Sequence, residues 1–141
     1  MSRQAIAHVT LVVRDYDEAI RYYIDKLGFC VIEDSPLAEN KRWVLIAPPG
    51  NAGACLLLAK AANENQQQAI GNQAGGRVGF FLFTDDFDGD YNRMISKGVS
   101  FIRPPMDEDY GTVAVFEDCY GNRWDLIQPT SSHSLYHRFN K

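Results

Sequence analysis

The 141-residue sequence predicts an α+β fold built from two tandem βαβββ modules. The first observation behind this prediction is an internal repeat: a strand, an acidic residue, a helix, a glycine and three further strands occur twice, about 70 residues apart. The second is composition, because 45% hydrophobic and 12% aromatic residues suffice for a sizeable core in a chain of this length.

The first copy begins with the apolar, β-branched stretch AIAHVTLVV, which is typical of a strand. Either Asp15 or Asp17 fits the N-cap of the helix that follows. Gly28 fits its end. The apolar face of this helix recurs at spacings of three and four residues and consists of Tyr16, Ala19, Ile20, Tyr23 and Leu27. The stretches FCVIEDSP, KRWVLIAPPG and GACLLLAK predict three more strands.

The second copy repeats this order in VGFFLFTDDFDGDYNRMISKGVSFIRPP, where Asp86 aligns with Asp15 and Gly98 with Gly28. Two more strands follow, GTVAVFED and NRWDLIQP, joined by the turn CYGN. The Gln- and Asn-rich stretch between the copies reads as a flexible or partly helical linker. We expect one domain over residues 1–141, made of module one (5–60), a linker (61–76), module two (77–129) and a tail (130–141).

Charge and composition exclude several classes of partner. A net charge of −4 argues against nucleic acid and against anionic membranes, and no apolar run reaches the length needed to span a bilayer. The segment MSRQAIAH does not resemble a secretory signal, and the three cysteines show no CxxC spacing. We therefore expect a reduced, cytoplasmic protein.

The opening HVTLVVRDYDEAIRYYIDKLGF and the closing VAVFEDCYGNRWDLIQP resemble the vicinal oxygen chelate superfamily, which includes glyoxalase I, bleomycin-resistance proteins and extradiol dioxygenases. The resemblance covers roughly residues 5–129. It implies that the curved mixed sheets of the two modules enclose a central cavity for a small molecule and, in many members, a divalent metal. It also implies a homodimer. The fold hosts enzymes and non-catalytic binders alike, so it does not define the function.

Metal-dependent members place His, Glu, His and Glu on the first and last strands of both modules. His8 occupies the first of these positions, but Gly79 stands at the matching position of module two and offers no ligand. Asp125 occupies the position on the last strand of module two. Its counterpart in module one is Cys55 or Leu57, depending on the strand register.

The resemblance therefore implies that His8 and Asp125 are the metal ligands, with Cys55 as a third. A tail histidine is a further candidate, since His133 and His137 would share one face if the tail were helical. The ion would be Zn, Ni, Fe or Mn, because imidazole and carboxylate suit these metals. Without a metal, His8 is expected to line a ligand cavity or to pack in the core.

Alternation along the strands suggests which other side chains face a ligand. Thr10 shares a face with His8, and Gly79 shares one with two phenylalanines, whereas the orientation of Trp43 stays open. Each aromatic residue also fits an ordinary core position. The predicted cavity lining is Thr10, Trp43, Leu57, Gly79, Phe81, Phe83 and Tyr110.

Three functions fit these residues, and whether the protein is an enzyme stays open. The favoured hypothesis is a metal-free protein that binds and sequesters an aromatic or amphipathic molecule, because Gly79 removes a ligand and the lining is aromatic. The second is a metal-dependent lyase or dioxygenase that uses His8 and Asp125. The third is acid–base catalysis by His8, with its pKa tuned by Asp125. The sequence does not decide whether the cavity lies within one chain or between two.

Overall fold

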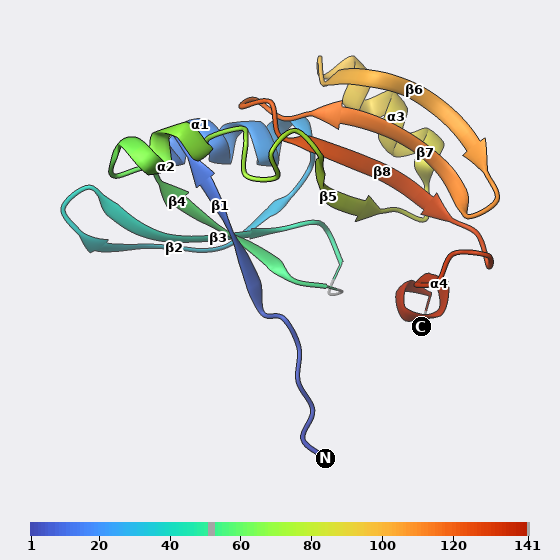
Figure 1. Cartoon of the computed structure of the whole chain (residues 1–141), viewed down its shortest axis with the longest axis horizontal. Coiled ribbons are helices and arrows are strands. Elements are labelled where there is room, and N and C mark those ends of the chain that lie inside the picture. The colour runs from blue at the N-terminus through green and yellow to red at the C-terminus, as the bar shows by residue number, and fades with distance from the viewer. Residues whose placement is uncertain (51–52, 141) are drawn as a thin grey trace. The chain divides into compact units, whose positions relative to one another are not determined.

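The computed structural model describes residues 1–50 and 53–140, so Lys141 of the predicted tail lies outside the described residues. The chain divides into two compact units, Met1–Gln73 and Ala74–Lys141 (Figure 1). Each unit contains one β-α-β-β-β sequence of elements and one four-stranded sheet. The predicted α+β fold with two tandem βαβββ modules is confirmed.

The first unit consists of β1 (His8–Val13), α1 (Tyr16–Arg21), a π-helical turn η1 (Tyr22–Lys26), β2 (Cys30–Ala38), β3 (Lys41–Ala47) and β4 (Cys55–Lys60). The strand order is β1-β4-β3-β2, with β1 parallel to β4 and the other neighbours antiparallel. A short helix, α2 (Glu64–Ala69), lies in the segment predicted to be a partly helical linker.

The second unit repeats this arrangement with β5 (Val78–Phe83), α3 (Phe87–Ser96), β6 (Ser100–Glu108), β7 (Gly111–Glu117) and β8 (Arg123–Pro129), and ends with α4 (Tyr136–Phe139). Its strand order is β5-β8-β7-β6. Three prolines lie on the edge strands, Pro36 on β2 and Pro104 and Pro105 on β6, where a missing N–H interrupts little of the ladder, and Pro129 is the last residue of β8. Among the described residues, the structure contains no helix that is long and apolar enough to cross a membrane.

Equivalent aspartates begin the two helices. The Asp15 carboxylate accepts a hydrogen bond from the Glu18 N–H at 2.9 Å, and the Asp86 carboxylate accepts one from the Gly89 N–H at 3.1 Å. These bonds satisfy N–H groups that the first turn of a helix leaves without partners. Asp15, rather than Asp17, is therefore the cap of α1. Gly28 follows the first helix with a φ of 77°, a left-handed conformation that glycine adopts without strain.

One face of each sheet packs against its helix, and we call the other the open face, although on the second sheet the open face also contains the buried side chains of Val113, Val115 and Ile127. In the second unit, Phe116 is 0% exposed and stacks on Trp124, which is 4% exposed. The ring of Phe101 contacts that of Tyr91 on α3, with 4.6 Å between the ring centres. Phe81, on the opposite face, is 62% exposed. The first unit follows the same rule with a buried set on its helix side: Leu11, Val13, Ala19, Tyr23, Val44, Ile46, Leu56 and Leu58.

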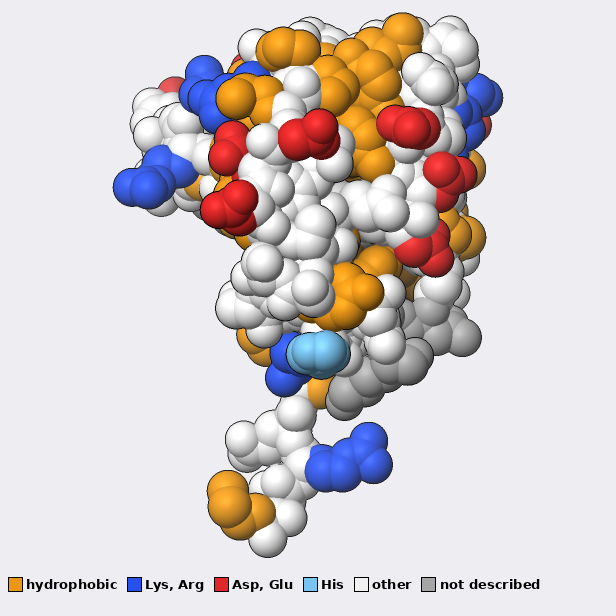
Figure 2. All heavy atoms as spheres, turned by 90° about the vertical axis from the view of Figure 1, so that its right-hand side faces the viewer, with side chains coloured by type: hydrophobic (Ala, Val, Ile, Leu, Met, Phe, Trp, Pro, Cys, Tyr) orange, Lys and Arg blue, Asp and Glu red, His pale blue; other side chains and the backbone are white. Residues whose placement is uncertain are grey.

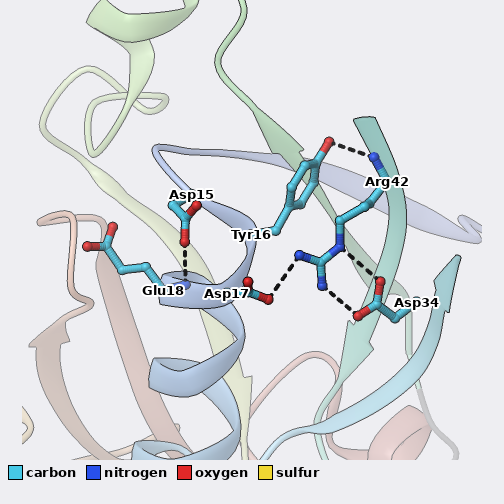
Figure 3. Close-up of polar contacts among 6 residues, drawn as sticks. All are labelled: Asp15, Tyr16, Asp17, Glu18, Asp34 and Arg42. Atoms are coloured by element: carbon cyan, nitrogen blue, oxygen red, sulfur yellow. Dashed lines mark hydrogen bonds and ion pairs between the residues drawn. The ribbon is translucent and has the colours of Figure 1, made fainter. Parts of the chain in front are cut away.

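Arg42 of β3 joins the helix side of the first sheet to α1 and β2 (Figure 3). Its guanidinium binds both carboxylate oxygens of Asp34, at 2.7 and 3.1 Å, and donates to Asp17 at 2.9 Å. It also lies over the Tyr16 ring, 5.2 Å from the ring centre. The hydrogen bonds from Asp34 and then Asp17 raise the pKa of Arg42 above its ordinary value, so the charge persists wherever the protein is folded.

We expect Arg42→Ala to lower the free energy of unfolding by about 1–2 kcal/mol, because it removes two ion pairs and a cation–π contact from a side chain that is only 28% exposed. Arg14→Ala is the control, since Arg14 is 63% exposed and makes one ion pair with Glu18 within the same turn. Its cost should stay below about 0.5 kcal/mol. Urea unfolding of both variants measures the difference, and equal losses would contradict a structural role for Arg42.

A second comparison tests which sheet face is the core. Phe116→Ala should cost about 3–5 kcal/mol because it empties a buried site, whereas Phe81→Ala on the open face of the same sheet should cost under about 1 kcal/mol. Chemical denaturation of the two variants gives both values. A larger loss for Phe81→Ala would reverse the assignment of the faces.

Candidate functional site

The strand register defines the open face of the first sheet. His8 pairs with Cys55 across β1 and β4, and Thr10 pairs with Leu57. Leu57 in turn pairs with Leu45 of β3. Side chains that are register partners point to the same face, so all five residues share the open face.

Trp43 lies on this open face as well, two residues before Leu45 along β3. Its ring meets the His8 imidazole edge to face, with 5.6 Å between the ring centres. This contact answers the question that the sequence left open for Trp43. His8 itself is exposed, so it is not a core residue.

The second sheet carries a polar row on its open face. Phe81 pairs with Asp125, Asp125 with Val115, and Val115 with Arg103, so the row crosses β5, β8, β7 and β6. Trp124 is buried on the other face, as alternation along β8 requires.

Arg103 is the site residue that sequence reasoning missed. Alternation from the helix-side residue Phe101 would place Arg103 on the helix side as well. However, Phe101 pairs with Phe116 while Arg103 pairs with Val115, the next residue of β7, because a bulge at Ile102 inserts one residue. No single-residue signal marks such a bulge in the sequence.

The same bulge occurs in the first sheet. Val31 pairs with Ile46 and Glu33 pairs with Leu45, so the shift turns Glu33 onto the open face of the first sheet. The Glu33 carboxylate accepts a hydrogen bond from the Ser35 hydroxyl at 2.9 Å. The two modules therefore present opposite charges at equivalent places, an acid on one open face and a base on the other.

Burial raises the pKa of the Asp125 carboxyl, and the positive charge of Arg103 opposes this shift without cancelling it. Asp125 and Arg103 make no hydrogen bond or ion pair within residues 1–50 and 53–140. The two side chains are thus close enough to interact electrostatically, but they form no direct hydrogen bond or ion pair with each other.

The tail covers Phe83, at the far end of β5. The Phe83 ring contacts His133 and Phe139, with ring centres 4.8 and 5.4 Å apart, and His133 also lies 6.1 Å from Tyr110. Figure 2 shows the side of the molecule that bears the β6–β7 hairpin, where carboxylates stand beside exposed apolar side chains. The exposed residues at this hairpin are Met106, Asp107, Glu108, Asp109 and Tyr110.

The condition under which His133 and His137 would share one helical face is not met, because α4 begins only at Tyr136. Residues 131–135 form turns, and the His133 Nδ1 accepts a hydrogen bond from the Leu135 N–H at 3.0 Å. His133 is therefore a packing residue of the tail.

The donor set does not fit a resident metal ion. When the caps Asp15 and Asp86 are superposed, the pair Thr10–Leu57 of the first sheet corresponds to Phe81–Asp125 of the second. Leu57, which has no donor atom, is thus the counterpart of Asp125, and Cys55 lies beside His8 instead. The part of the chain that the structure describes contains no group of three or more His, Cys, Asp or Glu side chains able to hold a metal.

Two βαβββ units, each with a mixed four-stranded sheet, define a protein of the vicinal oxygen chelate fold. Residues 5–126 match the model of the Glyoxalase/Bleomycin resistance protein/Dioxygenase superfamily, and the chain belongs to this superfamily. The resemblance found in the sequence is confirmed.

Three similar proteins illustrate its relatives. An uncharacterized protein of Shewanella frigidimarina is 61% identical over 89% of this chain and 94% of its own length. The crystal structure of UcmS2 has a TM-score of 0.77 and 31% identity, covering 89% of this chain and 98% of that one. TnmS3, an antibiotic binding protein from Streptomyces sp. CB03234, has a TM-score of 0.74 and 29% identity, covering 92% of this chain and 99% of that one.

The raised pKa of Asp125 predicts a pH-dependent stability. A carboxyl with a folded-state pKa above its unfolded value of 3.8 adds stability below that value and loses this contribution as the pH rises through the folded pKa. Asp125→Asn cannot ionise, so its Tm relative to the wild type should increase from pH 3 to pH 7. Thermal unfolding across this range measures the trend. A Tm difference that is constant with pH would contradict the assignment.

Proposed function

We propose that this protein binds and sequesters a small aromatic or amphipathic molecule, without a metal ion, on the open faces of its sheets. The observation that carries the proposal is the open row of the second sheet, where the exposed Phe81 ring lies beside the half-buried Asp125 carboxyl. An exposed phenyl ring and a partly desolvated carboxyl do not stabilise the folded state. On a ligand-binding surface, the ring can pack against a ligand and the carboxyl can form a hydrogen bond with it.

The first sheet supports the same proposal. Trp43 and His8 form an edge-to-face pair on its open face, and Leu45 and Leu57 provide the apolar surface beside them. A large aromatic surface with few polar groups suits recognition of a flat molecule. The structural similarity to TnmS3, an antibiotic binding protein, is a further reason to prefer binding over catalysis.

Members of this superfamily commonly bind divalent metals, so a metal-dependent lyase or dioxygenase is the main alternative. It would need Zn, Ni, Fe or Mn held by His8, Asp125 and Cys55. Gly79 and Leu57 leave two of the four ligand positions without a donor, which favours the metal-free proposal. The other alternative, acid–base catalysis by His8 tuned by Asp125, is less favoured, because the ring neighbour of His8 is Trp43, which has no acidic or basic group.

The proposal includes two further points that come from the family resemblance: a homodimer and a cytoplasmic location. Light scattering of the purified chain should give about twice 15.9 kDa if the dimer forms.

The central test is a thermal-shift screen of planar aromatic compounds, carried out on untagged protein with EDTA present. Some member should stabilise the protein, by about 2.7 kcal/mol when its concentration is a hundred times its Kd. Trp43→Ala should weaken a ligand of the first sheet, and Phe81→Ala a ligand of the second, by about three- to tenfold, as expected for loss of one aromatic contact.

The control for this screen is Ile95→Ala, which removes an exposed apolar side chain from α3, the helix on the other side of the second sheet from Phe81. It should leave the affinity unchanged. Stabilisation that disappears with EDTA, together with stoichiometric metal in the purified protein and its loss in His8→Ala, would replace the proposal with the metal-dependent alternative.

A further inference from the structure

The row Phe81, Asp125, Val115 and Arg103 places an aromatic ring, an acid, an apolar side chain and a base in that order across four neighbouring strands. Neighbouring strands lie about 4.8 Å apart, so the backbones of Asp125 and Arg103 are separated by about 10 Å and those of Phe81 and Arg103 by about 14 Å. This span matches a fused two-ring aromatic molecule with a substituent at its edge.

The rows on either side differ from this one. Toward the ends of β5 and β8 the next row consists of Phe83, Ile127, Val113 and Met106, which are apolar. The tail rings already cover Phe83. In this direction, the row of Asp125 and Arg103 is therefore the last row with polar side chains.

In the other direction, Arg123 and Glu117 pair with each other across β8 and β7 at 3.8 Å. Arg123 also donates to the Gly76 carbonyl oxygen at 3.0 Å. The charges of that row are satisfied within the unit. By contrast, Arg103 has no hydrogen bond or ion pair with the residues that the structure describes.

An exposed arginine fork and a half-buried carboxyl on one apolar face have complementary requirements. A guanidinium binds a carboxylate through two parallel N–H donors, and it does so more strongly beside apolar surface than in bulk water. An aspartate carboxylate that receives no hydrogen bond from the protein can accept one from a hydroxyl group of a ligand.

We propose that this row selects planar hydroxyaromatic acids, with the ring against Phe81, the hydroxyl donating to Asp125 and the ligand carboxylate accepting from Arg103. The inference rests on the proposed function and narrows it to one chemical class. It assigns Arg103 as the residue that distinguishes an acidic aromatic ligand from a neutral one of the same size.

The test uses three probes of similar size: 6-hydroxy-2-naphthoate, whose hydroxyl is too far from its own carboxylate to donate to it, 2-naphthol, which lacks the acid, and 2-naphthoate, which lacks the hydroxyl. Titration calorimetry with the full chain and EDTA should give binding of the hydroxy acid at least about tenfold tighter than that of 2-naphthol, since a charged, bidentate contact is added. In Arg103→Gln the two affinities should differ by less than about twofold, and Arg103→Lys should give an intermediate ratio.

The hydroxyl contact has its own variant. Asp125→Ala should remove the preference for 6-hydroxy-2-naphthoate over 2-naphthoate, because Arg103 still binds the carboxylate of both. Phe81→Ala should weaken all three probes by a similar factor, because the ring contacts the part that they share.

Arg93→Gln is the matched control, because Arg93 is also a partly exposed arginine with a carboxylate beside it, but it lies on α3. It should keep the wild-type preference for the acid. The inference would be overturned by equal affinities of the three probes for the wild type, or by an acid preference that survives Arg103→Gln. The broader binding proposal would still stand in either case if 2-naphthol binds in a Phe81-dependent manner. Absence of binding by all three probes would also overturn the inference, while the wider aromatic screen would separately decide the proposed function.

Discussion

In each unit a helix packs against one face of the four-stranded sheet, α1 against β3 and β4 and α3 against β8, and that face supplies most of the core. Because side chains alternate along a strand, this constraint divides every strand into two sets of residues with different roles. On β8, Trp124 and Leu126 are buried while Asp125 between them faces the open side. Core packing thus depends on Trp124 and Leu126, and the side chain between them is available for other roles.

The frame of the two modules is conserved between them, and their open faces are not. Equivalent caps, Asp15 and Asp86, start the helices, and equivalent bulges occur in β2 and β6. On the open faces, by contrast, Glu33 corresponds to Arg103. The duplicated architecture therefore presents two chemically different surfaces.

The sequence predicted the features that local physics controls. Helix caps and the glycine after the first helix depend on neighbouring residues, and both were correctly placed. The predicted turn CYGN also formed, and the Asp118 carboxylate before it accepts from the backbone N–H groups of Tyr120 and Asn122 at 2.9 Å.

The features that the sequence could not supply depend on contacts far along the chain or on a change of register. Trp43 required the pairing of β3 with β4 to fix its face. Arg103 required the bulge at Ile102, because strict alternation predicts the wrong side. His133 required the tail to return to Phe83, a contact between residues fifty positions apart. In each case the missing information is tertiary, and no local pattern encodes it.

Gly79 shows how a bulge alters the comparison of the two modules. Counted from the helix caps, it stands at the place of His8, but the register shift between Val78 and Phe80 makes Val78 the partner of Arg123, as His8 is the partner of Cys55. An added Cβ at Gly79 would approach the Ala74 Cβ to 3.2 Å, and Gly79 has no left-handed backbone. The backbone conformation therefore does not demand glycine there, whereas a Cβ at Gly89 would collide with the Asp86 carboxylate that caps α3. A small side chain at position 79 would need only a small shift of Ala74 and would leave the pairing of β5 with β8 intact.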